Sequence, residues 1–145
     1  MATRSFRNRL RLLVLAGTVG VIAALAPAIS ASSPAGLSFT KTCNPDYCTV
    51  ANSSNTGLIP NGSTLTYSGP RFDPHLSSGF VLATTGGTAT GHCSLKWATG
   101  TGGCIIEGGT GSLAGLHGVF SEWVDFGDGS FESFVFHLDG TYHVE

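Results

Sequence analysis

Three polar residues near the C-terminal end of the sequence have the types needed for a small acid–base site: Glu122, His137 and Tyr142. A carboxylate beside an imidazole can orient it as a general base, and a tyrosine hydroxyl can donate a hydrogen bond. No nucleophile and no metal-binding trio completes the group. The competing interpretation is a polar cluster that satisfies itself inside the fold or faces solvent. We expect this second interpretation to hold, and therefore binding rather than catalysis.

These residues meet only if two hairpins have a particular register. A turn at residues 127–130 would pair Phe126 with Phe131, and residues 139–140 would make a second, two-residue turn. One face of the meander would then hold the three polar residues among apolar ones: Phe120, Val124, Phe126, Phe131 and Val135. The other face would hold Val119, Trp123, Phe134, Phe136 and Leu138, with Asp125 and Glu132 near its tip. We therefore predict a ligand-binding set of Phe120, Val124, Val135, His137 and Tyr142.

The other groups able to bind metals or phosphates form no recognisable motif. The remaining histidines are scattered along the chain: His75, His92, His117 and His143. Two of them could meet in the folded chain, but their spacing alone does not predict a metal site. No phosphate-binding loop, dinucleotide fingerprint or nucleophile elbow is present. We expect no metal and no cofactor.

The cysteines predict disulfides. There are four of them, Cys43, Cys48, Cys93 and Cys104, and an even number in a small exported chain is typical of two bridges with three possible connectivities. We favour the local pairs Cys43–Cys48 and Cys93–Cys104, because each closes a short loop and the second would staple a hairpin. A zinc site is the alternative, but the spacing fits no close-paired zinc pattern.

Residues 1–31 have the features of a secretory signal peptide. A basic head is followed by an uncharged apolar run and then by small residues, which predicts cleavage after Ala28 or Ala31. A retained membrane anchor is the alternative, because the apolar run approaches the length that spans a bilayer. The small residues favour cleavage, so we expect a secreted protein with no stable membrane anchor.

The remaining chain, residues 32–145, has the size of one domain and is acidic. It keeps three basic residues, Lys41, Arg71 and Lys96, against all nine acidic ones, which gives a formal charge of −6. Such a surface repels phosphate backbones and anionic lipids, which excludes nucleic acid as a favoured partner.

Short alternating runs between turn signals predict an all-β fold, with no long helical period anywhere in this domain. We expect strands at residues 64–68, 80–84, 88–97, 104–107, 119–126, 131–138 and 141–144, after a flexible leader at 32–42. In one hairpin Cys93 would face Cys104 and Lys96 would face Thr101. About eight strands indicate a small antiparallel β-barrel, with an immunoglobulin-like β-sandwich as the alternative.

Two stretches resemble known families. Residues 108–118, which hold five glycines, resemble the glycine-rich strand corner of allene-oxide-cyclase-like and dirigent-like barrels. Together with residues 139–142 they are also similar to the end of a group of small exported bacterial proteins. That resemblance implies a barrel with an apolar cavity, but no residue here matches a catalytic residue of the plant cyclases. Residues 124–130 followed by 140–144 resemble the signature of PKD domains, which are immunoglobulin-like sandwiches of extracellular proteins.

The sequence therefore predicts a secreted β-barrel that binds an apolar small molecule or a partner without catalysis, because an aromatic-lined barrel interior can hold a ligand. One alternative is a cyclase-like or isomerase-like enzyme that uses Glu122, His137 and Tyr142. The other is an extracellular adhesion or cell-wall interaction module.

Overall fold

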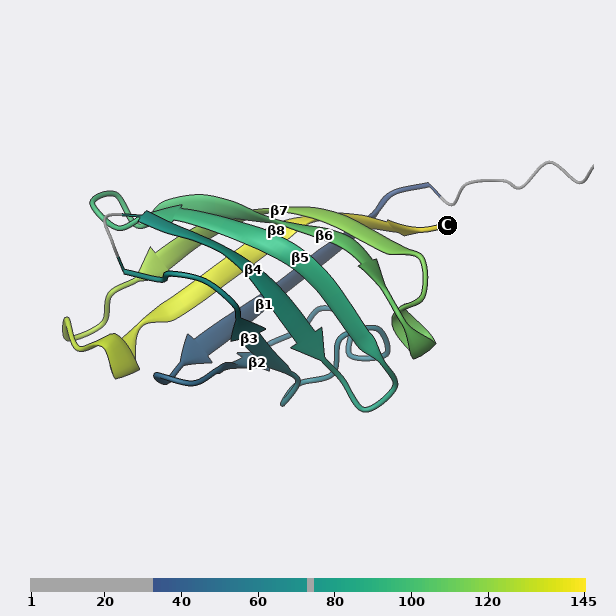
Figure 1. Cartoon of the computed structure of the whole chain (residues 1–145), viewed down its shortest axis with the longest axis horizontal. Coiled ribbons are helices and arrows are strands. Elements are labelled where there is room, and N and C mark those ends of the chain that lie inside the picture. Colours follow the sequence, from purple (N-terminus) through teal and green to yellow (C-terminus); the bar gives the residue numbers. More distant parts are fainter. Residues whose placement is uncertain (1–32, 73–74) are drawn as a thin grey trace, which may run out of the picture.

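The computed structural model describes residues 33–72 and 75–145, and it is a closed barrel of eight antiparallel strands (Figure 1). The predicted signal peptide lies outside the described residues. The strands are β1 (Ala35–Cys43), β2 (Cys48–Ala51), β3 (Thr64–Tyr67), β4 (His75–Ala83), β5 (Thr88–Lys96), β6 (Thr101–Gly109), β7 (Leu116–Asp125) and β8 (Val135–Val144). Two single-turn 3₁₀ helices, η1 (Gly111–Leu113) and η2 (Phe131–Ser133), flank β7.

The barrel closes because the first strand pairs with the last. Strand β1 is hydrogen-bonded to β2 on one side and to β8 on the other, from Ala35 opposite Tyr142 to Thr42 opposite Val135. Full closure leaves no unpaired sheet edge, which removes a common route to aggregation. The predicted all-β barrel is confirmed, and the immunoglobulin-like sandwich is wrong, because a sandwich consists of two separate sheets with edges.

Buried and exposed residues alternate along the strands, so that every second side chain points into the interior, and most of these side chains are apolar. In β7, for example, every second residue from Leu116 to Val124 is buried or inward while its neighbours are more exposed. Each fully buried Leu or Phe stabilises the fold by about 1.5–3 kcal/mol relative to leaving it exposed. Lys41 and Glu122 are the charged residues of the described chain that are buried in this core.

The expected flexible leader at residues 32–42 is wrong, because residues 35–42 form most of β1. Leu37, Phe39, Lys41 and Cys43 alternate with more exposed neighbours and point inward. A segment with period-two burial and hydrogen-bonded partners on both sides is a central strand of the barrel.

Both predicted disulfides are present, Cys43–Cys48 and Cys93–Cys104, and no described cysteine is free. The second one staples β5 to β6 in the predicted register, which also places Lys96 opposite Thr101. Two disulfides fit an extracellular or otherwise oxidising location. Within the described residues, no helix has both the length and the apolar character needed to span a membrane.

The predicted register of the last hairpins is wrong. Strand β7 meets β8 at Asp125 opposite Val135, so Phe126 does not pair with Phe131, which begins η2. The connection between β7 and β8 is longer than predicted, and two side chains stabilise it. Asp125 Oδ1 accepts from the amide of Gly127, and Ser133 Oγ donates to the carbonyl of Phe126. The hairpin loop therefore contains η2 instead of a short turn.

Residues 139–140 do not form a turn but lie inside β8. Gly140 faces Phe120 of β7, and the carbonyl of Val119 comes so close that a side chain at position 140 would collide with it. The glycine of this Asp-Gly pair is therefore explained by the close approach of the neighbouring strand, and not by a turn. The predicted strand at residues 141–144 is accordingly the second half of β8.

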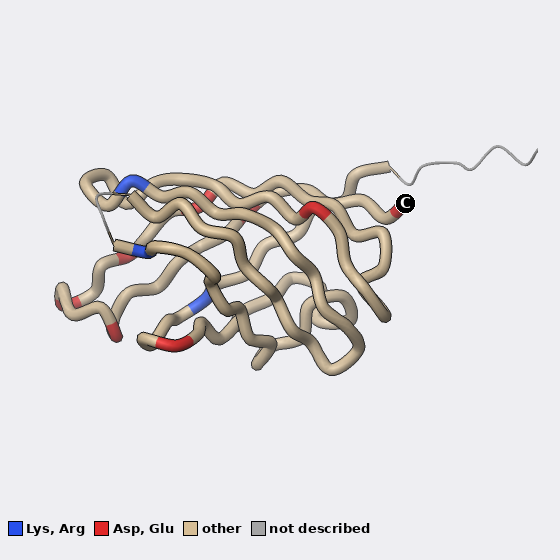
Figure 2. The backbone as a smooth tube through the Cα atoms, in the orientation of Figure 1, with Lys and Arg blue, Asp and Glu red and all other residues tan. Residues whose placement is uncertain are grey.

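The barrel has two ends. The mouth end, at the left of Figure 1, carries the connections at residues 44–47, 68–72, 97–100 and 126–134. The corner end, at the right, carries the connections at residues 52–63, 84–87 and 110–115 together with the last residue, Glu145. Acidic residues outnumber basic ones along the described chain (Figure 2).

Candidate ligand-binding site at the barrel mouth

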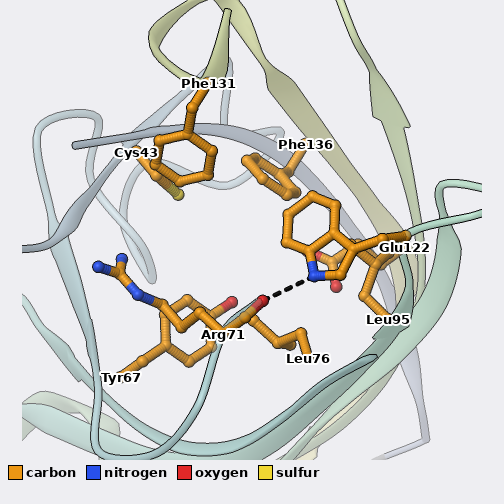
Figure 3. A pocket seen from close by; sticks show the side chains of 9 residues that line it. Cys43, Tyr67, Arg71, Leu76, Leu95, Glu122, Phe131 and Phe136 are labelled. Atoms are coloured by element: carbon orange, nitrogen blue, oxygen red, sulfur yellow. Dashed lines mark hydrogen bonds between the residues drawn. The ribbon is translucent and has the colours of Figure 1, made fainter. Parts of the chain in front are cut away.

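The described residues surround a small cavity at the mouth end of the barrel (Figure 3). It is lined by Cys43, Tyr67, Arg71, Leu76, Leu95, Trp97, Glu122, Phe131 and Phe136. The cavity volume is about 10 Å³, roughly the space that one buried water molecule needs. The lining is mostly apolar and aromatic, and its ionisable groups come from different strands and loops.

One lining residue of this cavity, Glu122, belongs to a buried ion pair. Lys41 Nζ of β1 lies 2.7 Å from Glu122 Oε1 of β7, and both side chains are only 1% exposed. The same ammonium group donates to the hydroxyl of Tyr67 of β3 at 2.5 Å. It also lies 5.1 Å from the centre of the Tyr67 ring and 5.3 Å from that of Phe136. Aromatic faces stabilise a nearby cation, so the lysine is held on several sides.

Burial and charge act on Lys41 and Tyr67 in different ways. Burial by itself lowers the pKa of Lys41, but its interactions with Tyr67 and Glu122 outweigh burial and raise that pKa above its usual value. Burial raises the pKa of Tyr67, and the neighbouring lysine offsets only part of the rise. At neutral pH the lysine is therefore charged and the phenol neutral.

Two hydrogen-bonding positions in this network have no partner among the described residues. Tyr67 accepts from Lys41, and no acceptor lies within reach of its own proton. Glu122 Oε2 lies 3.6 Å from Cys104 Sγ, but that sulfur is in a disulfide and has no proton to donate. For the same reason the group of Cys93, Cys104 and Glu122 cannot bind a metal through its sulfurs.

Aromatic side chains close the mouth above the network. Trp97 donates from Nε1 to the carbonyl of Arg71 at 2.7 Å, and Phe72 stacks on Trp97 with ring centres 5.8 Å apart. Phe131 of η2 meets Phe72 edge to face at 5.1 Å. The Arg71 guanidinium bonds to the carbonyls of Asn44 and Pro45. The cover is thus made from side chains of three connections, at residues 68–72, 97–100 and 126–134.

The predicted acid–base group is not formed. Glu122 points inward, whereas His137 is on the outer surface, where its ring stacks on Trp123 with centres 3.6 Å apart. Tyr142 packs against the core, but at the corner end, where its hydroxyl accepts from Asn55 Nδ2 at 3.1 Å. A strand that shifts by one residue turns every side chain to the opposite face, and the true register does this to His137.

The predicted ligand-binding residues are also dispersed. Phe120 and Val124 lie in the core, and Tyr142 is at the corner end. Val135 is half-buried on the same alternating side of β8 as His137. Of the predicted catalytic and ligand-binding residues, Glu122 alone lines the mouth cavity.

Sequence reasoning missed Lys41, Tyr67, Trp97 and the lining role of Phe131 and Phe136. One signal for Lys41 was present. It stands at a position in phase with Leu37, Phe39 and Cys43, so an alternating strand must turn it inward with them. A lone basic residue on the apolar stripe of a strand requires a buried partner of opposite charge.

The site can bind a hydrogen-bonding group but has little capacity for acid–base chemistry. Glu122 is tied to Lys41, and no imidazole is among the residues that line the cavity. Comparison with protein families, with curated proteins and with solved structures finds no match. The geometry of the site must therefore carry the functional argument.

Proposed function

We propose that this chain is an exported, non-catalytic binding protein, and that the mouth of its barrel takes a small, mostly apolar molecule. The proposal depends on one observation: an aromatic cavity is lined by Tyr67 and Glu122, two members of the buried polar network. A mostly apolar pocket with a few convergent polar groups is the usual form of a small-molecule site. The basic and apolar start of the sequence and the two disulfides support export.

The cavity favours an uncharged ligand. Lys41 and Glu122 neutralise each other, and the Arg71 guanidinium already donates to the carbonyls of Asn44 and Pro45, so the buried pair offers no counter-charge to a charged ligand. The free proton of Tyr67 and the free oxygen of Glu122 match a hydroxyl group, which accepts and donates, or a neighbouring N–H and carbonyl. The rest of the ligand would contact Trp97 and Phe136.

A ligand larger than water must displace part of the aromatic cover. Phe72 is 58% exposed and Phe131 is only half-buried, so either ring can turn outward without breaking a hydrogen bond. Exposed side chains change rotamer on the picosecond to nanosecond scale.

The test uses N-phenyl-1-naphthylamine, an uncharged aromatic fluorophore with one N–H donor. We expect saturable binding of one molecule, with a blue-shifted emission, to the purified protein with both disulfides formed. Phe131→Ala should strengthen binding about tenfold, because it removes a ring that must otherwise move. Phe126→Ala is the matched control, since Phe126 is a rim aromatic that does not line the cavity. Absence of saturable binding in both the parent protein and Phe131→Ala would contradict the proposal.

Native mass spectrometry of the protein purified from culture medium gives an independent answer. A bound molecule that is lost on mild denaturation would identify the ligand class directly. The same spectrum fixes the signal cleavage site and reports both disulfides.

A second function is favoured by the outer surface of β6 and β7. Ile105 lies opposite Val119 there, and Val119 is 65% exposed. Trp123, 48% exposed, lies further along the same strand. Large exposed apolar side chains on neighbouring strands are typical of an interaction surface. This surface supports an adhesion or cell-wall interaction module in which the barrel acts as a rigid scaffold.

Co-sedimentation with purified cell-wall material separates this second function from the first. Val119→Asp should abolish co-sedimentation, whereas Val81→Asp, on the outer surface of β4, should not. Equal sedimentation of the two variants would contradict the interaction surface.

A further inference from the structure

Two histidines that are far apart in the sequence meet at the corner end of the barrel. His117 of β7 lies directly opposite His143 of β8 in the strand pairing. Their rings stack with centres 5.4 Å apart and 17° between the planes. The side chains are 34% and 37% exposed, so both imidazoles are held by the sheet and still reach solvent. A cross-strand pair of this kind has both rings on one face of the sheet.

A carboxylate completes the group. Glu145 Oε2 lies 3.7 Å from His117 Nε2, and Glu145 Oε1 lies 3.6 Å from His143 Nε2. These separations are too long for hydrogen bonds. They are close to the spacing of two ligand atoms around one tetrahedral zinc ion, about 3.3 Å for metal–ligand bonds of about 2.0–2.2 Å. The two imidazoles approach different oxygens of the carboxylate, so the side chains must rotate to bring all three groups onto one ion.

The backbone holds Glu145 in place. Its amide donates to the carbonyl of Gly115 at 3.0 Å, in the tight corner between η1 and β7. Gly115 has φ +72°, and a side chain there would collide with the backbone of Glu145. The glycine corner therefore allows the last residue to lie against the start of β7, next to the histidine pair.

We propose that His117, His143 and Glu145 bind a divalent transition-metal ion, with Zn²⁺ as the representative case. Two imidazoles and one carboxylate suit zinc, copper or nickel, whereas calcium and magnesium prefer oxygen ligands alone. His117 and His143 line an open hollow of about 370 Å³ together with Glu107 and with no Lys or Arg, so the local charge favours a cation. Three protein ligands leave a coordination position open for water or for a group of a partner.

This site is independent of the ligand-binding proposal, because it lies at the opposite end of the barrel and shares no residue with the mouth cavity. A zinc ion here would also tie β7 to the final residue. Binding to the folded state alone raises the apparent stability of the protein in proportion to the free zinc concentration.

Isothermal titration with ZnCl₂ tests the proposal on the purified protein with both disulfides formed and without a histidine tag. We expect one zinc ion per chain. His117→Gln and His143→Gln should each weaken binding at least about tenfold, since even outer-shell partners of a ligand are worth about 10- to 100-fold. Glu145→Gln should weaken it about threefold or more. His92→Gln is the matched control, because His92 lies on the outer face of β5 beside Ser77 and should leave the affinity unchanged.

Paramagnetic broadening gives a second readout that does not depend on affinity. Substoichiometric Cu²⁺ should broaden the backbone NMR signals of His117, His143 and Glu145 before those of His92 or His137, and the remaining spectrum shows that each variant is folded. Equal zinc affinity in the parent protein and the two histidine variants overturns the site. Broadening centred on another histidine does the same, and an unchanged Glu145→Gln affinity overturns the three-ligand arrangement.

Discussion

The two ends of the barrel are closed in different ways, one by backbone segments and the other by side chains. At the corner end the backbone closes it: the connection at residues 52–63 inserts Ile59, which is fully buried, and η1 inserts Leu113. Glycines at positions 87 and 111 let the connections at residues 84–87 and 110–115 touch backbone to backbone. At the mouth end, side chains close it, because the rings of Phe72, Trp97 and Phe131 pack over the cavity.

This difference separates what each end can do. A backbone closure moves only if strands or tight turns come apart, so it holds attached groups at fixed positions, as a metal site requires. A closure made of side chains opens when one ring changes rotamer, as ligand uptake requires. The difference explains why we place the metal site at the corner and the ligand site at the mouth.

The largest expected effect concerns the buried pair below the mouth. Lys41→Met or Glu122→Leu alone leaves one buried charge without its partner, which should cost about 3–5 kcal/mol of unfolding free energy. The double variant removes both charges and should recover most of that loss. Urea unfolding at pH 7 measures all three, and a double variant as unstable as either single one would show that the pair is not the dominant interaction.

The next effect compares a glycine at each end. Gly115→Ala at the corner meets both a left-handed φ of +72° and the backbone of Glu145, and should cost about 2–3 kcal/mol. Gly129→Ala at the mouth meets a φ of +90° but open space, and should cost about 1 kcal/mol. Thermal unfolding of both variants measures the difference. Equal losses would mean that the corner is no more tightly packed than the mouth loop.

Alkaline pH should weaken the mouth end selectively. The pKa of Tyr67 is raised by burial, and that of Lys41 is raised by its partners, so above about pH 10 the folded state holds more protons than the unfolded state. Stability is then fully present at neutral pH and falls by roughly 1 kcal/mol per pH unit for each group. Urea midpoints from pH 8 to 11.5 should drop less in Tyr67→Phe, and Tyr47→Phe, an exposed tyrosine, is the control.

The smallest effect concerns the outer surface between the two ends. The stacked pair of Trp123 and His137 is exposed and lies directly across two strands, so its coupling should be about 0.2–1 kcal/mol. A double-mutant cycle with Trp123→Ala and His137→Ala measures it. A coupling of several kcal/mol would indicate that this surface is organised for more than packing.

The features set by local sequence were predictable. Short alternating runs and turn signals predicted the barrel, and the close spacing of the cysteines predicted both disulfides. The hairpin of β5 and β6 was predicted in the right register, because Cys93 and Cys104 anchor it at directly opposed positions.

The features set by packing across the barrel were not predictable in the same way. The connection after β7 is longer than a tight turn and is stabilised by hydrogen bonds of Asp125 and Ser133. Gly140 lies inside a strand, where it allows the neighbouring strand to come close, and does not form a turn. The misread turn before β8 put the side chains of the first half of that strand on the wrong face, which produced the mistaken grouping of Glu122 with His137. The true partner of Glu122 is Lys41, from the strand that looked like a loose leader.

The pairing of Lys41 with Glu122 also determines the order in which the barrel can assemble. The lysine belongs to the first strand and the glutamate to the seventh, so the two are made far apart in time during synthesis. A nascent chain without β7 and β8 lacks Glu122, which pairs with the lysine, and lacks the strand that closes the sheet. Closure of the barrel therefore requires contacts between the two ends of the domain, and we expect this step to be slow and to wait until the C-terminal strands are available.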